Sequence, residues 1–370
     1  MNTRAVDLQS FGADLDAIRD RVKAQIGAED VAYIKRVERA SRGFELVGRT
    51  LIHVSVEPAG FLTGVTFLWL HKQLQATEIG HTALHGAYDK LENAERYDSK
   101  TFRWETPIDE ESWRETHNVR HHGFTNIVGK DPDTHWGPLR LNSELPWRPH
   151  NQRQVGYAAL LATQFTAGIN LQYTGAGDYL DRRSERTDFI GDRSPQTRRK
   201  VLTRLLRKFV PYYGREYVMY PALAGPFFWK VLLGNWMTEV MRDIYSAATI
   251  YCGHVGEEVA DYPEGTKAGS RAEWYLMQVQ ATNDFEVPLP VSILCGALDR
   301  QVEHHLFPRF PPNRLRQIAP EVRAVCEAHG VPYRTDTWPN TLRKVFARFR
   351  QLGRPDEPSV ASTQRASLAA

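Results

Sequence analysis

The stretch WRETHNVRHHGFTN, residues 113–126, contains the spacing that decides the fold, His117-x3-His121-His122. Residues three or four apart on a helix share one face, so His117 and His121 point the same way while His122 lies about 100° round. Two further clusters have similar helical spacing, His81-x3-His85 and Gln301-x2-His304-His305. We therefore predict an all-α fold, a helical bundle in which several helices bring these side chains to one place.

The residue type indicates metal chemistry. Seven of the thirteen histidines lie in the three clusters. Neutral imidazole suits iron, zinc, copper and nickel, whereas thiolate ligands would indicate zinc or iron–sulfur clusters. A structural zinc ion takes four ligands, so seven imidazoles exceed what one such ion uses. We predict two iron-type ions, each with several imidazoles and an open position for oxygen. The segment with His117, His121 and His122 can supply ligands to both ions.

The clusters and their flanks resemble the histidine boxes of the membrane fatty acid desaturase family, the di-iron desaturases and hydroxylases. The matching stretches lie between residues 45 and 335 and are GHTALHGAYD (80–89), WRETHNVRHHGFTN with DPD behind it (113–133) and GALDRQVEHHLFP (296–308). Gln301 replaces a histidine at the start of box three, which is similar to the front-end and acyl-CoA desaturase branch.

The resemblance implies a ligand set for two iron ions (Fe2+/Fe3+), including one histidine outside the boxes in the segment IYCGHVGEE (250–258). The expected metal ligands are His81, His85, His117, His121, His122, His254, His304 and His305. A ligating imidazole usually donates its other N–H to a carboxylate or carbonyl. The candidates for this supporting role are Gln301, Asp89, Asp131 and Glu303. Catalytic residues beyond the ligands stay unassigned, and no organic cofactor is expected.

The implied activity is that of an oxygen-dependent desaturase, which introduces a double bond into a fatty acyl chain carried by CoA or by a lipid. Neither a His-Pro-Gly-Gly heme signature nor a glycine fingerprint of a flavin or nicotinamide domain occurs. The resemblance then implies a separate ferredoxin or cytochrome b5-type electron donor. Two alternatives remain open: a di-iron hydroxylase of lipids, alkanes or carotenoids, and a zinc hydrolase or non-catalytic metal-binding helical protein. The hydrolase alternative lacks an HExxH motif.

Composition narrows the class of protein. The 47 basic and 44 acidic side chains nearly balance, and no zinc-finger spacing or basic stripe interleaved with aromatics indicates a nucleic-acid partner. Three cysteines without a CxxC spacing predict neither a disulfide framework nor an iron–sulfur site. The beginning of the chain lacks a basic-then-apolar leader, so no signal peptide is expected.

Three units are expected along the chain. They are an amphipathic helical segment (1–45), a desaturase-like di-iron domain (46–335), and a C-terminal helix with a disordered tail (336–370). Apolar stretches near 51–70, 155–177 and 217–236 favour two to four membrane-embedded helices under a cytosolic histidine-rich cap. The expected location is thus a membrane, multi-pass or interfacial, with membrane lipid as a partner and the metal site facing the cytoplasm. The mean hydropathy of −0.47 is low for a polytopic protein, so buried helices of a soluble bundle are the alternative.

Overall fold

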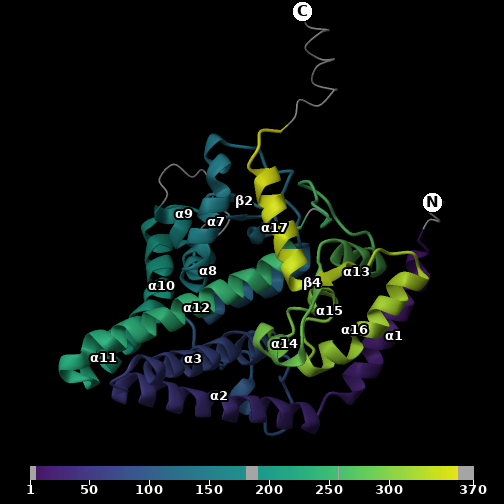
Figure 1. Cartoon of the computed structure of the whole chain (residues 1–370). Coiled ribbons are helices and arrows are strands. Elements are labelled where there is room, and N and C mark those ends of the chain that lie inside the picture. The colour runs from purple at the N-terminus through teal and green to yellow at the C-terminus, as the bar shows by residue number, and fades with distance from the viewer. Residues whose placement is uncertain (1–5, 181–190, 257, 357–370) are drawn as a thin grey trace, which may run out of the picture.

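Helices form most of the computed structural model, which describes residues 6–180, 191–256 and 258–356 (Figure 1). The first helices are α1 (Leu8–Gln25), α2 (Ala28–Val54), α3 (Pro58–Leu74), η1 (Gln75–His81), α4 (Thr82–Leu84), η2 (Glu95–Tyr97), α5 (Glu110–Trp113), η3 (Arg114–His121), α6 (His122–Phe124) and η4 (Pro132–Thr134). Those that follow are η5 (Pro149–Arg153), α7 (Gln154–Ala162), α8 (Phe165–Tyr173), α9 (Ala176–Leu180), α10 (Pro195–Gly214), η6 (Arg215–Met219), α11 (Tyr220–Leu223) and η7 (Gly225–Phe227). The last are α12 (Phe228–His254), α13 (Arg271–Gln280), α14 (Leu289–Cys295), α15 (Gln301–Leu306), α16 (Pro312–Ala328) and α17 (Trp338–Leu352). The prediction of a mostly helical fold is confirmed.

The strands are short. β1 (His135–Trp136) pairs antiparallel with β2 (Leu139–Arg140), directly after box two. β3 (Asp284–Glu286) pairs in parallel with β4 (Thr335–Thr337), and this pairing ties the segment before α14 to the approach of α17. Both pairs brace loops around the helices and form no extended sheet.

A close pair of helices positions box one. α2 and α3 run side by side (Figure 1), and two glycines allow their backbones to approach. A Cβ at Gly48 would lie 2.5 Å from the backbone nitrogen of Leu68, and one at Gly64 would lie 2.8 Å from that of Ile52. Box one follows at the end of α3, so this packing sets its place in the fold.

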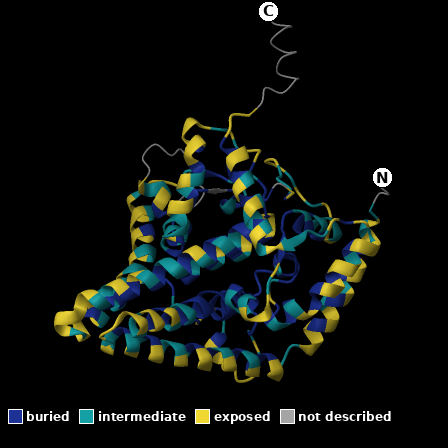
Figure 2. Cartoon of the chain, viewed as in Figure 1, coloured by how far each residue is buried: buried dark blue, intermediate teal, exposed yellow. Residues whose placement is uncertain are grey.

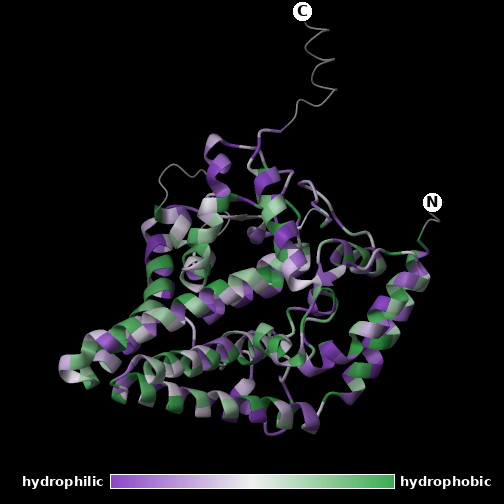
Figure 3. Ribbon diagram, in the orientation of Figure 1, coloured by the Kyte–Doolittle hydropathy of each residue, from purple (hydrophilic) through white to green (hydrophobic). Residues whose placement is uncertain are grey.

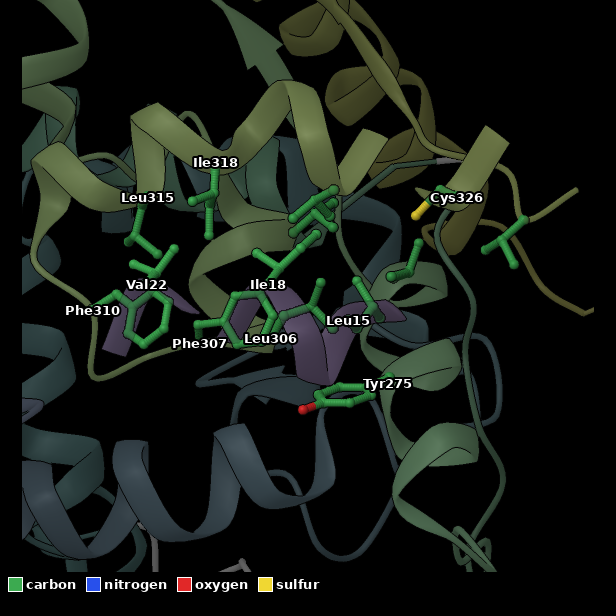
Figure 4. Packing of buried hydrophobic residues seen from close by; sticks show 14 of the residues in the cluster. Leu15, Ile18, Val22, Tyr275, Leu306, Phe307, Phe310, Leu315, Ile318 and Cys326 are labelled. Carbon is green, nitrogen blue, oxygen red and sulfur yellow. The ribbon is translucent and has the colours of Figure 1, made fainter. Parts of the chain in front are cut away.

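The N-terminal helix supports box three. Leu15 and Ile18 of α1 pack in one hydrophobic cluster with Leu306, at the end of box three, and with Leu315 and Ile318 of α16 (Figure 4). Through this cluster, α1 packs on the body that carries the histidines. The expected unit boundary after residue 45 falls inside α2. Residues 357–370 of the expected disordered tail lie outside the described residues.

Five buried charged side chains join α3, η6 and α12 in what we call the buried ion network. The Nζ of Lys72 lies 2.9 Å from a carboxylate oxygen of Glu216 and also pairs with Glu239. Arg242 completes the network, 2.6 Å from Glu239 and 2.8 Å from Asp243. Because every member has an opposite charge in contact, these helices carry ionised groups in their interior.

The expected membrane-embedded helices are not found as spans. None of the helices in the described part of the chain is long and apolar enough to cross a bilayer. The stretch 155–177 is divided between α7 and α8, of nine residues each. The stretch 217–236 begins in the π-helix η6 and is broken around Gly225 before α12 starts, and α12 contributes three charges to the buried ion network.

Candidate metal centre

Four parts of the chain meet at the histidines. Box one lies at the junction of η1 and α4, box two at that of η3 and α6, box three on α15, and His254 is the last residue of α12. The structure brings all eight predicted ligands into one site. His254 is half-buried, and the others are buried, namely His81, His85, His117, His121, His122, His304 and His305.

Boxes one and two lie at the ends of π-helical turns, not in regular α-helix. The backbone N–H of His122 donates to the carbonyl of His117, five residues earlier. A turn with this i→i+5 bond holds more residues than an α-helical turn, and such turns are frequent at functional sites. In a regular α-helix His122 would lie about 140° round from His117, five residues earlier. The wider turn brings the two rings closer to one face, and the Nε2 of His122 is 3.2 Å from the Nε2 of His117.

The ligand nitrogens form two neighbouring groups. In the first, those of His81, His85, His117 and His304 all lie within 4.8 Å of one another. The Nε2 of His81 is 3.4 Å from that of His117 and 3.3 Å from that of His85. Box two contributes to both groups, because His117 belongs to this one and His121 to the next.

The second group contains His121, His254 and His305, also within 4.8 Å of one another. The Nε2 atoms of His254 and His305 are 3.3 Å apart. His122 lies between the groups, since its ring stacks on His305 with centroids 4.3 Å apart and is 4.8 Å from the ring of His304. The arrangement offers two adjacent positions for metal ions.

Burial keeps most of these imidazoles neutral. Desolvation, helped by the neighbouring histidine rings, lowers the pKa of His81 to about 3. It lowers the pKa of six others well below the ordinary range: His85, His117, His122, His254, His304 and His305. A neutral imidazole has the free lone pair that metal binding requires.

His121 differs from the rest. Burial would lower its pKa, but the carboxylate of Asp131, 3.1 Å from Nδ1, and that of Asp133 together raise the pKa of His121 to about 9. The contact holds a proton on Nδ1 and directs Nε2, which has no hydrogen-bond partner, into the histidine cluster. A carboxylate behind a ligand histidine commonly orients the ring in this way and raises its basicity.

The donor set fits metal ions. Bare Nε2 atoms face each other at 3.2 to 3.4 Å, and a shared proton can satisfy only one such pair at a time. Metal–nitrogen bonds of about 2.0–2.1 Å place neighbouring ligand nitrogens roughly 3.0–3.4 Å apart, which matches the observed spacing. Several buried ring nitrogens have no hydrogen-bond partner, among them His81 Nδ1, His121 Nε2, His122 Nδ1, His254 Nδ1 and His304 Nε2.

Of the four candidate supporting residues, two contact a ligand histidine and two bond to other groups. Asp131 contacts His121, and the amide nitrogen of Gln301 lies 2.6 Å from the Nε2 of His254. Asp89 instead accepts hydrogen bonds from the backbone N–H and the hydroxyl of Ser99, and Glu303 accepts one from Tyr333. Burial and the neighbouring Asp284 raise the pKa of Glu303 well above its usual range.

Three contacts were missed by sequence reasoning. The Nδ1 of His305 is 2.9 Å from the side-chain oxygen of Gln278 and 3.2 Å from the hydroxyl of Thr125. The indole of Trp113 stacks on His117 with ring centroids 4.4 Å apart. Thr125 and Trp113 lie beside box two, so proximity could have suggested them. Gln278, on α13, has no motif around it.

A cavity of about 120 Å³ lies beside the histidines. His81, His117, His121 and His254 line it. Much of the remaining wall is aromatic or aliphatic, including Trp104, Trp113, Trp136, Phe165, Ile169 and Tyr251. The wall is therefore suited to an apolar group beside the ligand nitrogens, with little water present.

Comparison with known proteins agrees with this geometry. The model of the family described as fatty acid desaturase matches residues 57–337. A Mycobacterium tuberculosis protein, NADPH-dependent stearoyl-CoA 9-desaturase, is 32% identical over 360 residues, covering 95% of this chain and 81% of the relative. The sn-1 linoleoyl-lipid 6-desaturase of Synechocystis sp. is 26% identical over 74% of each chain. Human fatty acid desaturase 3 is 23% identical over 65% of this chain and 50% of the relative.

Proposed function

The chain belongs to the fatty acid desaturase family and is a desaturase, and from this premise we propose that it introduces a double bond into a long-chain acyl group with two irons, molecular oxygen and electrons from a separate carrier. One observation carries the proposal: seven histidines form two adjacent groups with His122 between them, and four of these eight histidines line a largely apolar cavity. Two neighbouring ions suit the four-electron reduction of oxygen better than one.

The reaction balances as follows. Two hydrogen atoms leave adjacent carbons, and two electrons and two protons arrive from outside, so that one oxygen molecule becomes two waters. An alkyl C–H bond has no acidic proton, so acid–base groups alone cannot break it. When bound, the irons would supply the oxidising chemistry with oxygen. His81, His85, His117 and His304 would hold one ion, and His121, His254 and His305 the other, with His122 between them.

The protein's own groups prepare the site. Burial keeps seven imidazoles neutral. The Nδ1–H of His121 donates to Asp131, so that the Nε2 of His121 faces the centre. The apolar wall aligns the chain and excludes water, which limits side reactions. Trp113, stacked on His117 and lining the cavity, presents a flat surface beside the ligands.

We propose acyl-CoA as the carrier of the acyl group. The relative with the longer match, over 95% of this chain, is named for stearoyl-CoA, whereas the one named for a lipid substrate matches 74%. The reaction with an acyl-lipid uses the same histidines and remains the competing outcome. Hydroxylation also uses the same centre, so only the product separates it from desaturation.

The test is product analysis. Iron-loaded protein, reduced by dithionite with methyl viologen under oxygen, is given stearoyl-CoA or a stearoyl phospholipid, and the products are identified by mass spectrometry. We expect a mono-unsaturated product from the CoA ester that is absent with His304→Ala. Elemental analysis should find about two irons per chain in the wild type and fewer in the variant. A hydroxylated product, a product from phospholipid alone, or a zinc-only protein would overturn the respective part of the proposal.

We also propose that the enzyme attaches to a membrane surface through one apolar tip. Lys230 at the start of α12 donates to the carbonyls of His53 and Ser55, so the ends of two helical hairpins meet there. Much of the chain at this tip is exposed (Figure 2), and Figure 3 shows hydrophobic residues along the same helices. They include Val54, Val56, Leu223, Phe227, Phe228 and Trp229. Exposed apolar patches of this kind mark interaction or membrane surfaces.

Vesicle binding tests the attachment. The protein should co-sediment with phosphatidylcholine vesicles containing phosphatidylglycerol, and Phe227→Glu with Phe228→Glu should reduce the bound fraction several-fold. The matched control is Phe346→Glu, which changes an exposed phenylalanine on α17. Equal binding by the tip variant would overturn the proposed surface. The orientation of the metal site toward the cytoplasm stays a prediction.

A further inference from the structure

Helix α10 is basic along its whole length. The segment Pro195–Gly214 contains six basic side chains and no acidic one. Three of the six pair with carboxylates between residues 109 and 115, namely Arg204, Arg207 and Lys208. These pairs hold one side of α10 against the protein body and satisfy the charges on that side.

The other three basic side chains are exposed and pair with no carboxylate among the described residues. They are Arg198, Arg199 and Lys200, near the beginning of α10. The neighbouring acidic residue Asp192 instead accepts hydrogen bonds from Ser194 and Thr197. The N-terminal end of a helix carries a partial positive charge, so cations there do not stabilise the helix. An anion from outside the chain would balance them.

An exposed apolar row begins beside these arginines. Leu202, Leu206 and Val210 are 41%, 50% and 62% exposed. Residues four apart lie only about 40° from one another round a helix, so the three side chains form one row. Arg198 and Arg199 line the same shallow groove as Leu202 and Leu206. We call these two arginines and the three apolar residues the α10 outer face.

The α10 outer face leads to the apolar tip. α10, η6 and α11 follow one another without a break as far as Leu223, a residue of the tip, and α10 lies at an edge of the molecule (Figure 1). Val218 and Met219 are exposed along the way. At roughly 1.5 Å per residue, Arg199 and Leu223 are about 36 Å apart along the helix. The arginines and the tip are therefore separate contacts that can be tested one by one.

We propose that the α10 outer face lies on the bilayer surface, with Arg198 and Arg199 bound to the phosphate groups of anionic phospholipids. This inference rests on the membrane attachment proposed above and names the lipid class that it selects. A guanidinium group donates two parallel hydrogen bonds to a phosphate. A helix with basic and apolar side chains of this kind lies in the plane of the interface. The apolar row contacts acyl chains of any lipid, and the arginines supply the preference for negative charge.

The first experiment compares vesicles of phosphatidylcholine alone with vesicles that also contain phosphatidylglycerol. We expect the anionic lipid to strengthen binding of the wild type about tenfold or more at low salt. Arg198→Glu with Arg199→Glu should abolish this preference. The matched control, Lys35→Glu with Arg36→Glu, makes the same change in net charge at an adjacent exposed pair on α2 and should keep the preference. Equal urea midpoints in all three proteins check that each is folded.

A second measurement locates the apolar row. Leu206→Cys is labelled with an environment-sensitive fluorophore, and the three native cysteines stay unlabelled because they are buried. Lipids with brominated acyl chains should quench this label. They should not quench the same label at the control position Arg323→Cys, which is exposed on α16.

The outcomes are separable. An unchanged preference in the double arginine variant overturns the proposal, and so does an equal loss in the control or an unquenched label at residue 206. Loss of the preference on adding free CoA would assign the arginines to the phosphates of CoA and overturn the lipid surface. Binding to both kinds of vesicle without preference would leave the tip in place and remove the lipid class. Binding to neither would remove the membrane attachment itself.

Discussion

Two buried polar regions of this protein lie near the same cavity and differ in how they are satisfied. In the buried ion network, the charges of Lys72 and Arg242 are matched by carboxylates in direct contact. In the histidine site, imidazole nitrogens face one another at 3.2 to 3.4 Å, and several, including those of His121 and His304, have no partner. Charges that the fold itself pairs hold helices together, whereas buried donor atoms left unpaired indicate a ligand from outside.

The contrast also concerns protonation. The network contains ionised groups, and the Lys72 and Arg49 charges hold the pKa of Glu216 below its usual range despite its burial. Seven of the eight imidazoles in the histidine site are neutral because burial lowers their pKa. His121, paired with Asp131, is the exception. The following predictions break or sharpen this distinction, from the largest expected effect to the smallest.

Removal of one unpaired ligand should have the largest effect. His121→Ala should lose metal from the second nitrogen group and reduce desaturation by at least about a thousandfold, since the chemical step depends on the ions. The matched control His150→Ala changes an exposed histidine outside the boxes and should keep both metal and activity. Elemental analysis and product assays measure the two quantities. Full metal content in the first variant would refute its assignment as a ligand.

Breaking the paired region should damage stability and leave metal chemistry intact. Arg242→Met leaves the buried Asp243 carboxylate without its cation, while Glu239 keeps Lys72, and loss of one partner of a buried pair costs about 3–5 kcal/mol. Urea unfolding should show this decrease in the free energy of unfolding, while iron per folded chain stays at the wild-type level. Arg323→Met, which breaks an exposed pair with Glu327, should leave the midpoint unchanged. A loss of iron before unfolding would make the network part of the metal site.

A smaller effect should separate the two aspartates proposed from sequence. Asp131→Asn removes the carboxylate behind His121 and should weaken metal binding about 10–100-fold. Asp89→Asn should leave affinity unchanged, because Asp89 bonds to Ser99 and to no histidine in the described structure. The metal affinities of both variants are measured by competition with a chelator at pH 9. This pH is close to the pKa of His121, so about half of the His121 side chains are already neutral. Equal affinities in the two variants would remove Asp131 from the site.

The smallest effect is a pH dependence with a defined sign. The pKa of His121 is about 9, so below this pH a metal ion must displace a proton from it, whereas the other imidazoles are already neutral. Co2+ affinity should therefore rise about tenfold per pH unit from pH 7 to 9 and then level off. Optical titration follows it, and Asp131→Asn should flatten the slope. A slope of several protons per ion would mean that more of the histidines are protonated.

Much of the site followed from local spacing. The three boxes predicted the helices that carry them, and His81 with His85, and His117 with His121, share a face because residues three or four apart do so in a helix. Asp131 lies ten residues from His121, close enough for the chain itself to bring it there. Asp89 lies even closer in sequence to box one, but its carboxylate accepts hydrogen bonds from Ser99 and contacts no ligand histidine. Proximity in sequence therefore does not decide which group a carboxylate faces.

The apolar stretches were a weaker guide. Hydropathy alone cannot distinguish a helix in lipid from one buried in protein, because both exclude water. Neither can it reveal that Lys72 finds its partners Glu216 and Glu239 more than a hundred residues away in the chain. The π-helical turns were also unpredictable, because the same spacing of His117, His121 and His122 fits an α-helix.

The sequence by itself determined the ligand types, their grouping into boxes and the helical elements that present them, since these depend on contacts within one or two turns. Only the tertiary structure decided how the nitrogens divide into two groups and that Gln301 contacts His254. It also decided that Gln278 contacts the Nδ1 of His305, and that Val119 in the box-two segment is exposed to solvent. Those features arise where segments far apart in the chain pack together, and local spacing carries no information about which segments meet.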